Sequence, residues 1–318
     1  MISRPAALAR HAAGHALAFV ATVAGASAFV LLLLEAAPGD PIDLLPNGED
    51  VRSVLEQEWG LDQPLVWRWL QFLARACTGD LGTSLAYRPG APVLDVIAGP
   101  ALRSSAYFFS AMALCMGVGT ALGTLTAGRA RWLNPFVSVL SLPPLFLLAH
   151  LCVNALNGLA WRAIQAGAIE RPDWFALPDQ ASLLRTSLAI ALLAVGSGAL
   201  SDVHGQVEEV LTDVRSSAYV DHARARGKPV LPHILANLVA PLAGIATSRA
   251  AFFAGGLVVL EKVLLLNGVG AILWQAAQLR DYNVALGVTL LMATLVAGVR
   301  LIGDVVRTIA DPRLRRTR

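Results

Sequence analysis

The segment AAGHALAFVATVAGASAFVLLLL, residues 12–34, contains no Asp, Glu, Lys or Arg. A helix that crosses a bilayer needs about 20 consecutive apolar residues, so this segment is long enough to span one. Five further segments are mostly apolar and of similar length: residues 104–127, 133–156, 183–200, 234–260 and 283–303. The sequence therefore predicts an all-α polytopic membrane protein with about six transmembrane helices in a single domain, residues 1–318.

The composition favours the same class of protein. The 318-residue chain is 56% hydrophobic and 15% charged, whereas a soluble domain carries about 25% charged residues. Cys77, Cys115 and Cys152 are scattered along the chain and two of them fall inside predicted spans, so no disulfide framework and no metal site is predicted. The net charge of +3 is explained by membrane topology, and we infer no nucleic-acid binding from it.

The first apolar segment has two interpretations. Arg4 and Arg10 precede it, as in a secretory signal that is later removed. Its apolar run is long, however, and no convincing small-residue cleavage site precedes Glu35. We therefore expect a retained first transmembrane helix, with a cleaved signal as the alternative.

Basic residues gather at one side of the predicted spans. They occur in the N-terminal tail, at Arg129 and Arg131, in residues 224–228 and in the tail 313–318. Because short cytoplasmic loops retain positive charge, both termini are predicted to be cytoplasmic. Residues 35–103 then form a long extracytoplasmic segment, in which acidic residues outnumber basic ones. The spacing of its tryptophans predicts short amphipathic helices, either at the membrane surface or in a packed cap.

The stretch YVDHARARGKPVLPH, residues 219–233, is the most polar part near the middle of the chain. Ser216 and Ser217 before it are candidate N-caps, and Gly227, followed by Pro229, is a candidate C-terminal stop. These signals predict a helix of about ten residues, too short to span a membrane. Its small residues would allow close approach of a partner protein, and its cations would anchor that partner. The cytoplasmic coupling loop as a whole is predicted to cover residues 201–233, and the alternative is a charged loop that only sets the topology.

This stretch resembles the cytoplasmic EAA loop of binding-protein-dependent ABC transporter permeases, in the oligopeptide, dipeptide and nickel branch. YVDHARARG at 219–227 and HILANLVAP at 233–241 are similar to the family's YVRTARAKG and H-x-L-x-N-x-L-x-P. Asp221, His222, Ala223 and Gly227 stand at the positions of the Glu, the two Ala and the Gly. Between Gly227 and His233 the chain is shorter than the family pattern by about four residues, or one helical turn.

Further motifs of the family occur in the same order along nearly the whole chain. They are PGDP (38–41), WGLDQPLVWRWLQF (59–72), GDLGTS (79–84), PVLDVI (92–97), GGLVVLEKVLLLNGVGAIL (255–273), RDYNVALG (280–287) and DPRLRR (311–316). Together they are similar to the first of the two permeases in such systems.

The resemblance implies an inner-membrane permease subunit of an ATP-driven importer, which forms a pathway for a peptide-like substrate by alternating access. The implied partners are a second permease, two ATP-binding subunits and an extracytoplasmic solute-binding protein. The ATPase-docking residues would be Tyr219, Asp221, His222, Ala223, Arg224, Arg226 and Gly227. ATP and Mg would be bound by the partner subunits, so no cofactor is expected in this chain.

The chain lacks the motifs of an ATPase or a hydrolase. Its only Gly-Lys pair is Gly227-Lys228, with Pro229 next and His222 where the first glycine of a phosphate-binding loop should stand. It contains neither an H-E-x-x-H zinc motif nor a G-x-S-x-G nucleophile elbow. We therefore expect a transport subunit that is not itself an enzyme.

Two ionisable residues within predicted spans are candidates for the substrate pathway, because charges inside a bilayer usually face a partner or a wet cavity. Arg249, in GIATSRAAFF, could attract a substrate carboxylate or form a buried pair with an acid. His150 could line the pathway or serve in packing. Pro143 and Pro144 are expected to break or kink the third span, and Pro241 the fifth.

Other functions remain open on the residues alone. A permease for nickel, a metal chelate or another small solute competes with a peptide importer, and an exporter matches the motifs less well. A membrane scaffold or channel without an ATPase is the alternative from another class.

Overall fold

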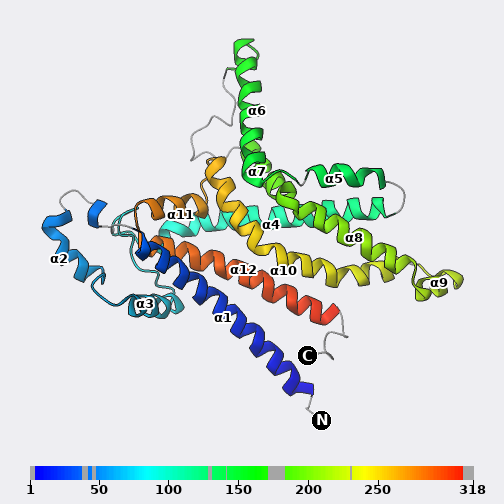
Figure 1. Cartoon of the computed structure of the whole chain (residues 1–318), viewed down its shortest axis with the longest axis horizontal. Coiled ribbons are helices and arrows are strands. Elements are labelled where there is room, and N and C mark those ends of the chain that lie inside the picture. Colours follow the sequence, from blue (N-terminus) through cyan, green and yellow to red (C-terminus); the bar gives the residue numbers. More distant parts are fainter. Residues whose placement is uncertain are drawn as a thin grey trace. The chain divides into compact units, whose positions relative to one another are not determined.

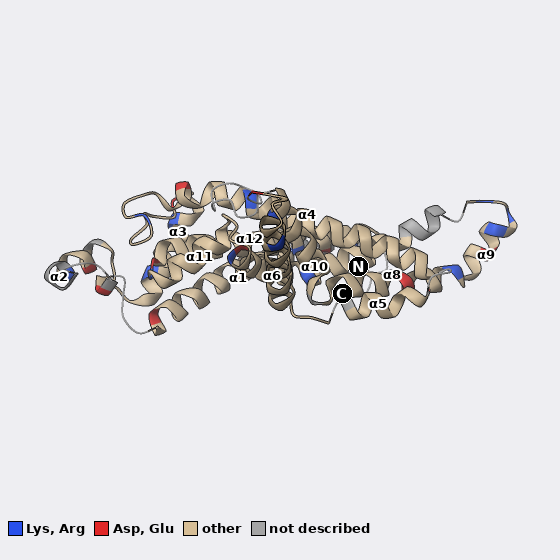
Figure 2. Cartoon of the chain, turned by 90° about the horizontal axis from the view of Figure 1, so that it is seen from above, with Lys and Arg blue, Asp and Glu red and all other residues tan. Residues whose placement is uncertain are grey.

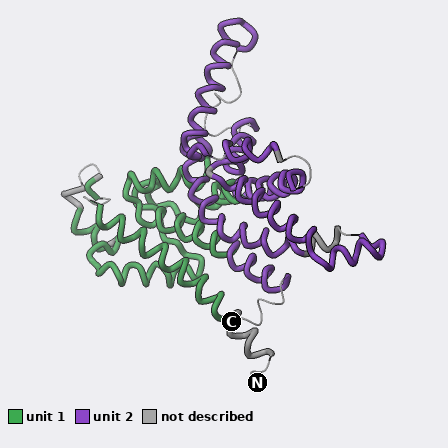
Figure 3. Tube along the Cα trace, turned by 45° about the vertical axis from the view of Figure 1, so that its right-hand side comes forward, with its two compact units in different colours: residues 1–105, 267–298 green, residues 106–266, 299–318 purple. Residues whose placement is uncertain are grey.

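The computed structural model describes residues 4–37, 42–44, 48–127, 131–140, 142–170, 183–229 and 231–310. Within these ranges every regular element is helical, which confirms the all-α prediction. The chain divides into two compact units (Figure 3). Unit 1 contains residues 1–105 and 267–298, and unit 2 contains residues 106–266 and 299–318. The PGDP and DPRLRR motifs lie outside the described residues.

Five helices of the described chain are long and apolar enough to cross a membrane. They are α1 (Arg4–Ala36), α4 (Val93–Thr126), α6 (Leu145–Gln165), α10 (Leu231–Val263) and α12 (Tyr282–Ala310), labelled in Figure 1. A sixth span results if α7 (Leu183–Val195) and α8 (Ala199–Arg215) count as one, although they are bent by 50° at the short turn η4 (Gly196–Gly198). The prediction of about six spans is therefore confirmed.

Several predicted boundaries were wrong. Helix α4 begins at Val93, directly after Pro92 and well before residue 104. The predicted span 133–156 is divided into η2 (Arg131–Leu133), α5 (Asn134–Leu140) and α6. The division falls at Pro143 and Pro144, since proline lacks the N–H that a helix interior needs. By contrast, α10 continues through Pro241 as one helix.

The predicted fourth span and the loop predicted after it also differ from the structure. Residues 183–200 do not form one straight helix, because the Gly-Ser-Gly turn η4 interrupts them, and Gly/Ser pairs are common sites of helix kinks. Most of the predicted loop 201–233 is helical instead: α8 continues to Arg215, α9 covers Ala218–Ala225 and α10 begins at Leu231.

Unit 1 contains the short helices that the tryptophan spacing predicted. These are α2 (Gly48–Glu58) and α3 (Leu65–Cys77), preceded by the 3-10 turn η1 (Ile42–Leu44). Phe72 of α3 packs in an apolar cluster with Leu31 of α1, Leu85, and Tyr282 and Leu286 of α12. A second cluster joins the start of α4 to α11 (Val269–Gln278) and α12.

A buried carboxylate connects the loop before α4 to the start of α12. Asp281 is fully buried, and its Oδ2 accepts hydrogen bonds from the Ser84 hydroxyl at 2.6 Å and from the backbone N–H groups of residues 85–87 at 2.9 to 3.0 Å. Its Oδ1 accepts the N–H of Val284 at 3.1 Å, which caps the first turn of α12. The acid of the RDYNVALG motif is therefore a structural anchor of unit 1.

Unit 2 is built around α8 and α10, which pack against each other, while α10 also contacts α6 and α7. Two glycines bring α4 close to α8. A Cβ atom at Gly119 would lie 2.5 Å from Cγ1 of Val203, and one at Gly123 would lie 2.8 Å from the carbonyl oxygen of His204. This spacing of small residues, four apart on one helix face, lets membrane helices approach closely.

Candidate functional site

The candidate docking site is the short helix α9, which follows α8 (Figures 1 and 2). Ser217 occupies its N-cap position, as predicted. Its hydroxyl does not cap the helix, however, because it donates a hydrogen bond back to the carbonyl oxygen of Val214 at 2.5 Å. Ser216 does the same toward Asp213 at 3.0 Å, so the prediction of a side-chain cap was wrong.

The C-terminus of α9 is stopped by Gly227, as predicted. Gly227 has φ +65°, in the left-handed region, and its N–H bonds the carbonyl of Arg224 at 2.9 Å. The N–H of Lys228 bonds the carbonyl of Ala223, also at 2.9 Å. This pair of bonds is a Schellman motif, which gives α9 a defined end.

The two faces of α9 differ in exposure. Val220 and Ala223 are 0% and 7% exposed and turn toward the chain itself, where α9 contacts α8. The remaining predicted docking residues are exposed: Tyr219, Asp221, His222, Arg224, Arg226 and Gly227. Ala223 therefore holds α9 on the protein, and the exposed face is the one that a partner could contact.

Contacts within the site hold its side chains in place. Arg224 pairs with Asp221 at 3.2 Å, and Nδ1 of His222 lies 3.0 Å from the carbonyl oxygen of Ala218. The side-chain amide of Asn237, on α10, donates to the hydroxyl of Tyr219 at 3.1 Å. The Tyr219–Asn237 bond connects α9 directly to α10, one of the candidate membrane spans.

Helix α8, on which α9 packs, is itself tied to its neighbours. Nε2 of His204 lies 2.9 Å from the Thr126 hydroxyl of α4, and Glu208 accepts a hydrogen bond from Asn134 of α5 at 3.0 Å. Arg215, the last residue of α8, donates to the carbonyl oxygen of Ala127 at 2.9 Å. A displacement of α9 would therefore be passed to α8, and through it to α4 and α5.

The two candidate pathway residues do not share one site. Arg249, on α10, forms an ion pair with Asp202 in the first turn of α8. The structure thus shows an ion pair with an acid, which was one of the two alternatives for Arg249. His150 lies on α6 with an exposed side chain. Sequence reasoning missed Asp202 and Asn237. The available signal was that Arg249 is the one charged residue within residues 234–260, and that Asp202 is the first acid after the apolar segment 183–200.

The sequence of this chain also matches a known protein family. The model of the binding-protein-dependent transport system inner membrane component matches residues 113–316, a range that includes α5 to α12 with α9. The chain belongs to this family. It is therefore a permease component of the inner membrane, and the prediction of a transport subunit that is not an enzyme is confirmed.

Several named proteins are similar in sequence to this permease over almost its full length. A protein of Brucella suis biovar 1 named as a peptide permease is 31% identical over 307 residues, which cover 91% of this chain and 93% of the relative. A Brucella ovis peptide permease is also 31% identical, with the same coverage. The glutathione transport system permease protein GsiC of Escherichia coli K12 is 28% identical over 314 residues, 94% of this chain and 96% of the relative.

Proposed function

We propose that this permease is the first of two membrane subunits in an ATP-driven importer of peptide-like solutes. Its family supports the transport role, and the names of its relatives, which describe peptide and glutathione permeases, support the substrate class. The remaining subunits in the proposal are a second permease, two ATPases that bind ATP and Mg, and an extracytoplasmic solute-binding protein.

The observation that carries the proposal is the construction of α9. It is a short helix with a defined end, anchored through Val220 and Ala223 and connected to α10 through Tyr219 and Asn237. Its outer face carries exposed charged residues and small ones. Such a rigid, anchored helix is suited to receive a force from a partner and to pass it to the spans.

In the proposed mechanism, closure of the ATPases on ATP moves α9 on the cytoplasmic side. Because α9 packs on α8 and is bonded to α10, these helices move with it and reorient the pathway by alternating access. Both termini would be cytoplasmic, and residues 35–103 would face the opposite side, where the solute-binding protein delivers its cargo. The distribution of basic residues in the sequence supports this orientation.

Two alternatives have distinct consequences. A metal-chelate importer would need the same partners but a different solute. Within the described part of the chain, no group of three or more His, Cys, Asp or Glu side chains could hold a metal ion. A scaffold or channel would need no ATPase, and this difference is directly testable.

The test is co-purification of the tagged permease from its native cells in mild detergent, with the proteins identified by mass spectrometry. We expect a second permease and ATPases, and ATP hydrolysis in the purified sample. Gly227→Val should lower ATPase recovery about five- to tenfold, because a β-branched residue in the left-handed region costs about 1–2 kcal/mol. Gly227→Asn is the matched control, since asparagine tolerates this conformation. Isolation of the unaltered permease alone, or equal ATPase recovery with both variants, would contradict the proposal.

A further inference from the structure

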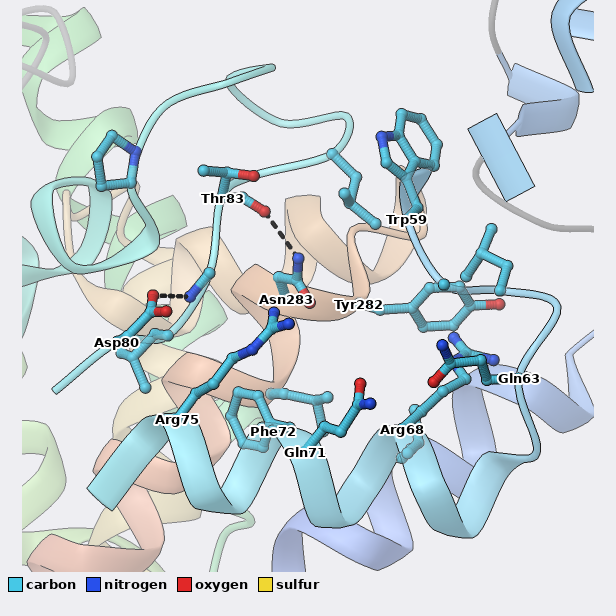
Figure 4. Close-up of a pocket in the computed structure, with 18 of the residues that line it drawn as sticks. Trp59, Gln63, Arg68, Gln71, Phe72, Arg75, Asp80, Thr83, Tyr282 and Asn283 are labelled. Carbon is cyan, nitrogen blue, oxygen red and sulfur yellow. Dashed lines mark hydrogen bonds between the residues drawn. The ribbon is translucent and has the colours of Figure 1, made fainter. Parts of the chain in front are cut away.

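Unit 1 contains a polar cavity of about 600 Å³ to which the docking mechanism gives no role (Figure 4). It is formed by residues 57–63, helix α3, residues 80–85 and the start of α12, with a contribution from α1. Arg68, Gln71 and Arg75 point into it from α3, and Trp59, Thr83 and Asn283 face them (Figure 4). Aromatic, amide and cationic side chains thus meet in one concave site, as in many small-molecule sites.

The two arginines of this cavity differ in what they can still bind. Arg68 pairs with Glu35 at 3.1 Å and lies over the ring of Tyr282, 5.1 Å from its centroid. Arg68 is therefore part of the wall. Among the described residues, no carboxylate lies within ion-pairing distance of Arg75, whose guanidinium extends into the cavity (Figure 4). Arg75 is thus available for an anion, and a carboxylate fits the guanidinium fork with two parallel hydrogen bonds.

A second group in the cavity also lacks a partner. The side-chain oxygen of Gln63 is buried and accepts no hydrogen bond from any described residue. A buried acceptor without a donor is costly, so the free energy would favour a turn of the Gln63 side chain that brings this oxygen to the N–H group of a ligand in the cavity. Arg75 lies toward one end of the cavity and Gln63 toward the other, and the rings of Trp59, Phe72 and Tyr282 lie around the space (Figure 4).

We propose that this cavity binds the free C-terminal end of a short peptide. The carboxylate would bind Arg75, and an apolar side chain would lie against the aromatic rings. A peptide N–H would donate to the oxygen of Gln63 after the Gln63 side chain turns toward the cavity. The preference for a peptide over other acids with amide groups rests on the proposed function. The permease itself thereby contributes to the selection of its substrate, in addition to any selection by a solute-binding protein.

The experiment uses the full permease in lipid nanodiscs, without partner subunits, and isothermal titration calorimetry. The probes are the tripeptide Ala-Ala-Phe with a free C-terminus and the same tripeptide with a C-terminal amide. We expect saturable binding of the free acid and binding of the amide weaker by about tenfold, the loss of one charge-assisted interaction. Absence of saturable binding, or equal binding of the two probes, would overturn the inference.

Substitutions of single residues test whether the tripeptides bind in this cavity. Arg75→Gln should abolish the preference for the free acid, whereas Arg75→Lys, which keeps the charge, should retain part of it. Gln63→Leu should weaken both probes by about fivefold without lowering thermal stability, because it removes an acceptor that has no partner. Arg88→Gln is the matched control, since Arg88 belongs to the same unit, lies over the neighbouring ring of Tyr87 and does not line the cavity.

A preference that survives Arg75→Gln, or that is lost in Arg88→Gln, would refute the assignment to this cavity. The binding assay involves neither ATPases nor ATP. A permease that recovers its ATPases but binds neither tripeptide would therefore refute only the cavity, and the reverse result would refute only the importer.

Discussion

Replacing Gly123 with leucine is expected to force α4 and α8 apart and to leave little folded permease in the membrane. The Cβ of any residue at this position would lie 2.8 Å from the carbonyl oxygen of His204, which is part of the α8 backbone and cannot rotate away. The side chain of Val207 lies at the same distance. Overpacking of this kind costs about 3 kcal/mol, a large part of the roughly 5–15 kcal/mol that stabilises a domain.

Gly117→Leu is the matched control for this prediction. Gly117 lies on the same helix, six residues before Gly123, and a Cβ there would meet nothing within 4 Å. Fluorescence-detected size-exclusion chromatography gives the amount of folded protein, and a thermal ramp gives its Tm. Similar yields and similar Tm values for the two leucine variants would show that α4 and α8 do not approach each other as closely as described.

The second large effect is expected from breaking the ion pair between α8 and α10. In an Arg249→Met variant, Asp202 would lose its partner, and for a pair whose side chains are 32% and 38% exposed this loss costs about 1–2 kcal/mol. A double variant with Asp202→Asn should recover most of the stability, because no unpaired charge then remains. Thermal unfolding of the two single variants and the double variant measures this coupling.

ATP-dependent peptide uptake by the assembled complex separates the two roles considered for Arg249. With a structural pair, the double variant recovers both assembly and uptake, which is the result we expect. If Arg249 instead binds a substrate carboxylate, the double variant assembles but uptake stays low, and the structural role is refuted. The same assay applied to His150→Leu decides whether His150 belongs to the pathway.

The long spans could be predicted from the sequence because their signal is local. The run of apolar residues that ends before Glu35 is enough to define α1, and the two prolines at 143 and 144 are enough to separate α5 from α6. Helix α8 was missed because it carries many charged residues, so it was assigned to a loop. Its buried residues Val203, Val207, Leu211 and Val214 recur at intervals of three or four, a helical period that is present even though the segment has no long apolar run.

In α9, too, some features depend on local sequence and others on tertiary packing. Gly227 and Pro229 define the end of α9 through backbone geometry, which depends on residue type alone. The burial of Ala223 and the bond between Tyr219 and Asn237 depend on how α9 packs against α8 and α10, so they could not be predicted from residue types. The pairing of Arg249 with Asp202 likewise depends on how α10 packs against α8, so residue types alone could not predict it.

The central claim, that an ATPase docks on α9, is tested most directly by site-specific cross-linking. Cys77, Cys115 and Cys152 are first replaced by serine. One cysteine is then placed at Ala225, which is exposed on α9, or at Ala74, which is exposed on α3. Membranes of cells that contain the whole system are treated with a thiol-to-amine cross-linker. We expect an ATPase adduct from Ala225→Cys and none from Ala74→Cys; no ATPase adduct from Ala225→Cys, or equal adducts from both positions, would contradict the account.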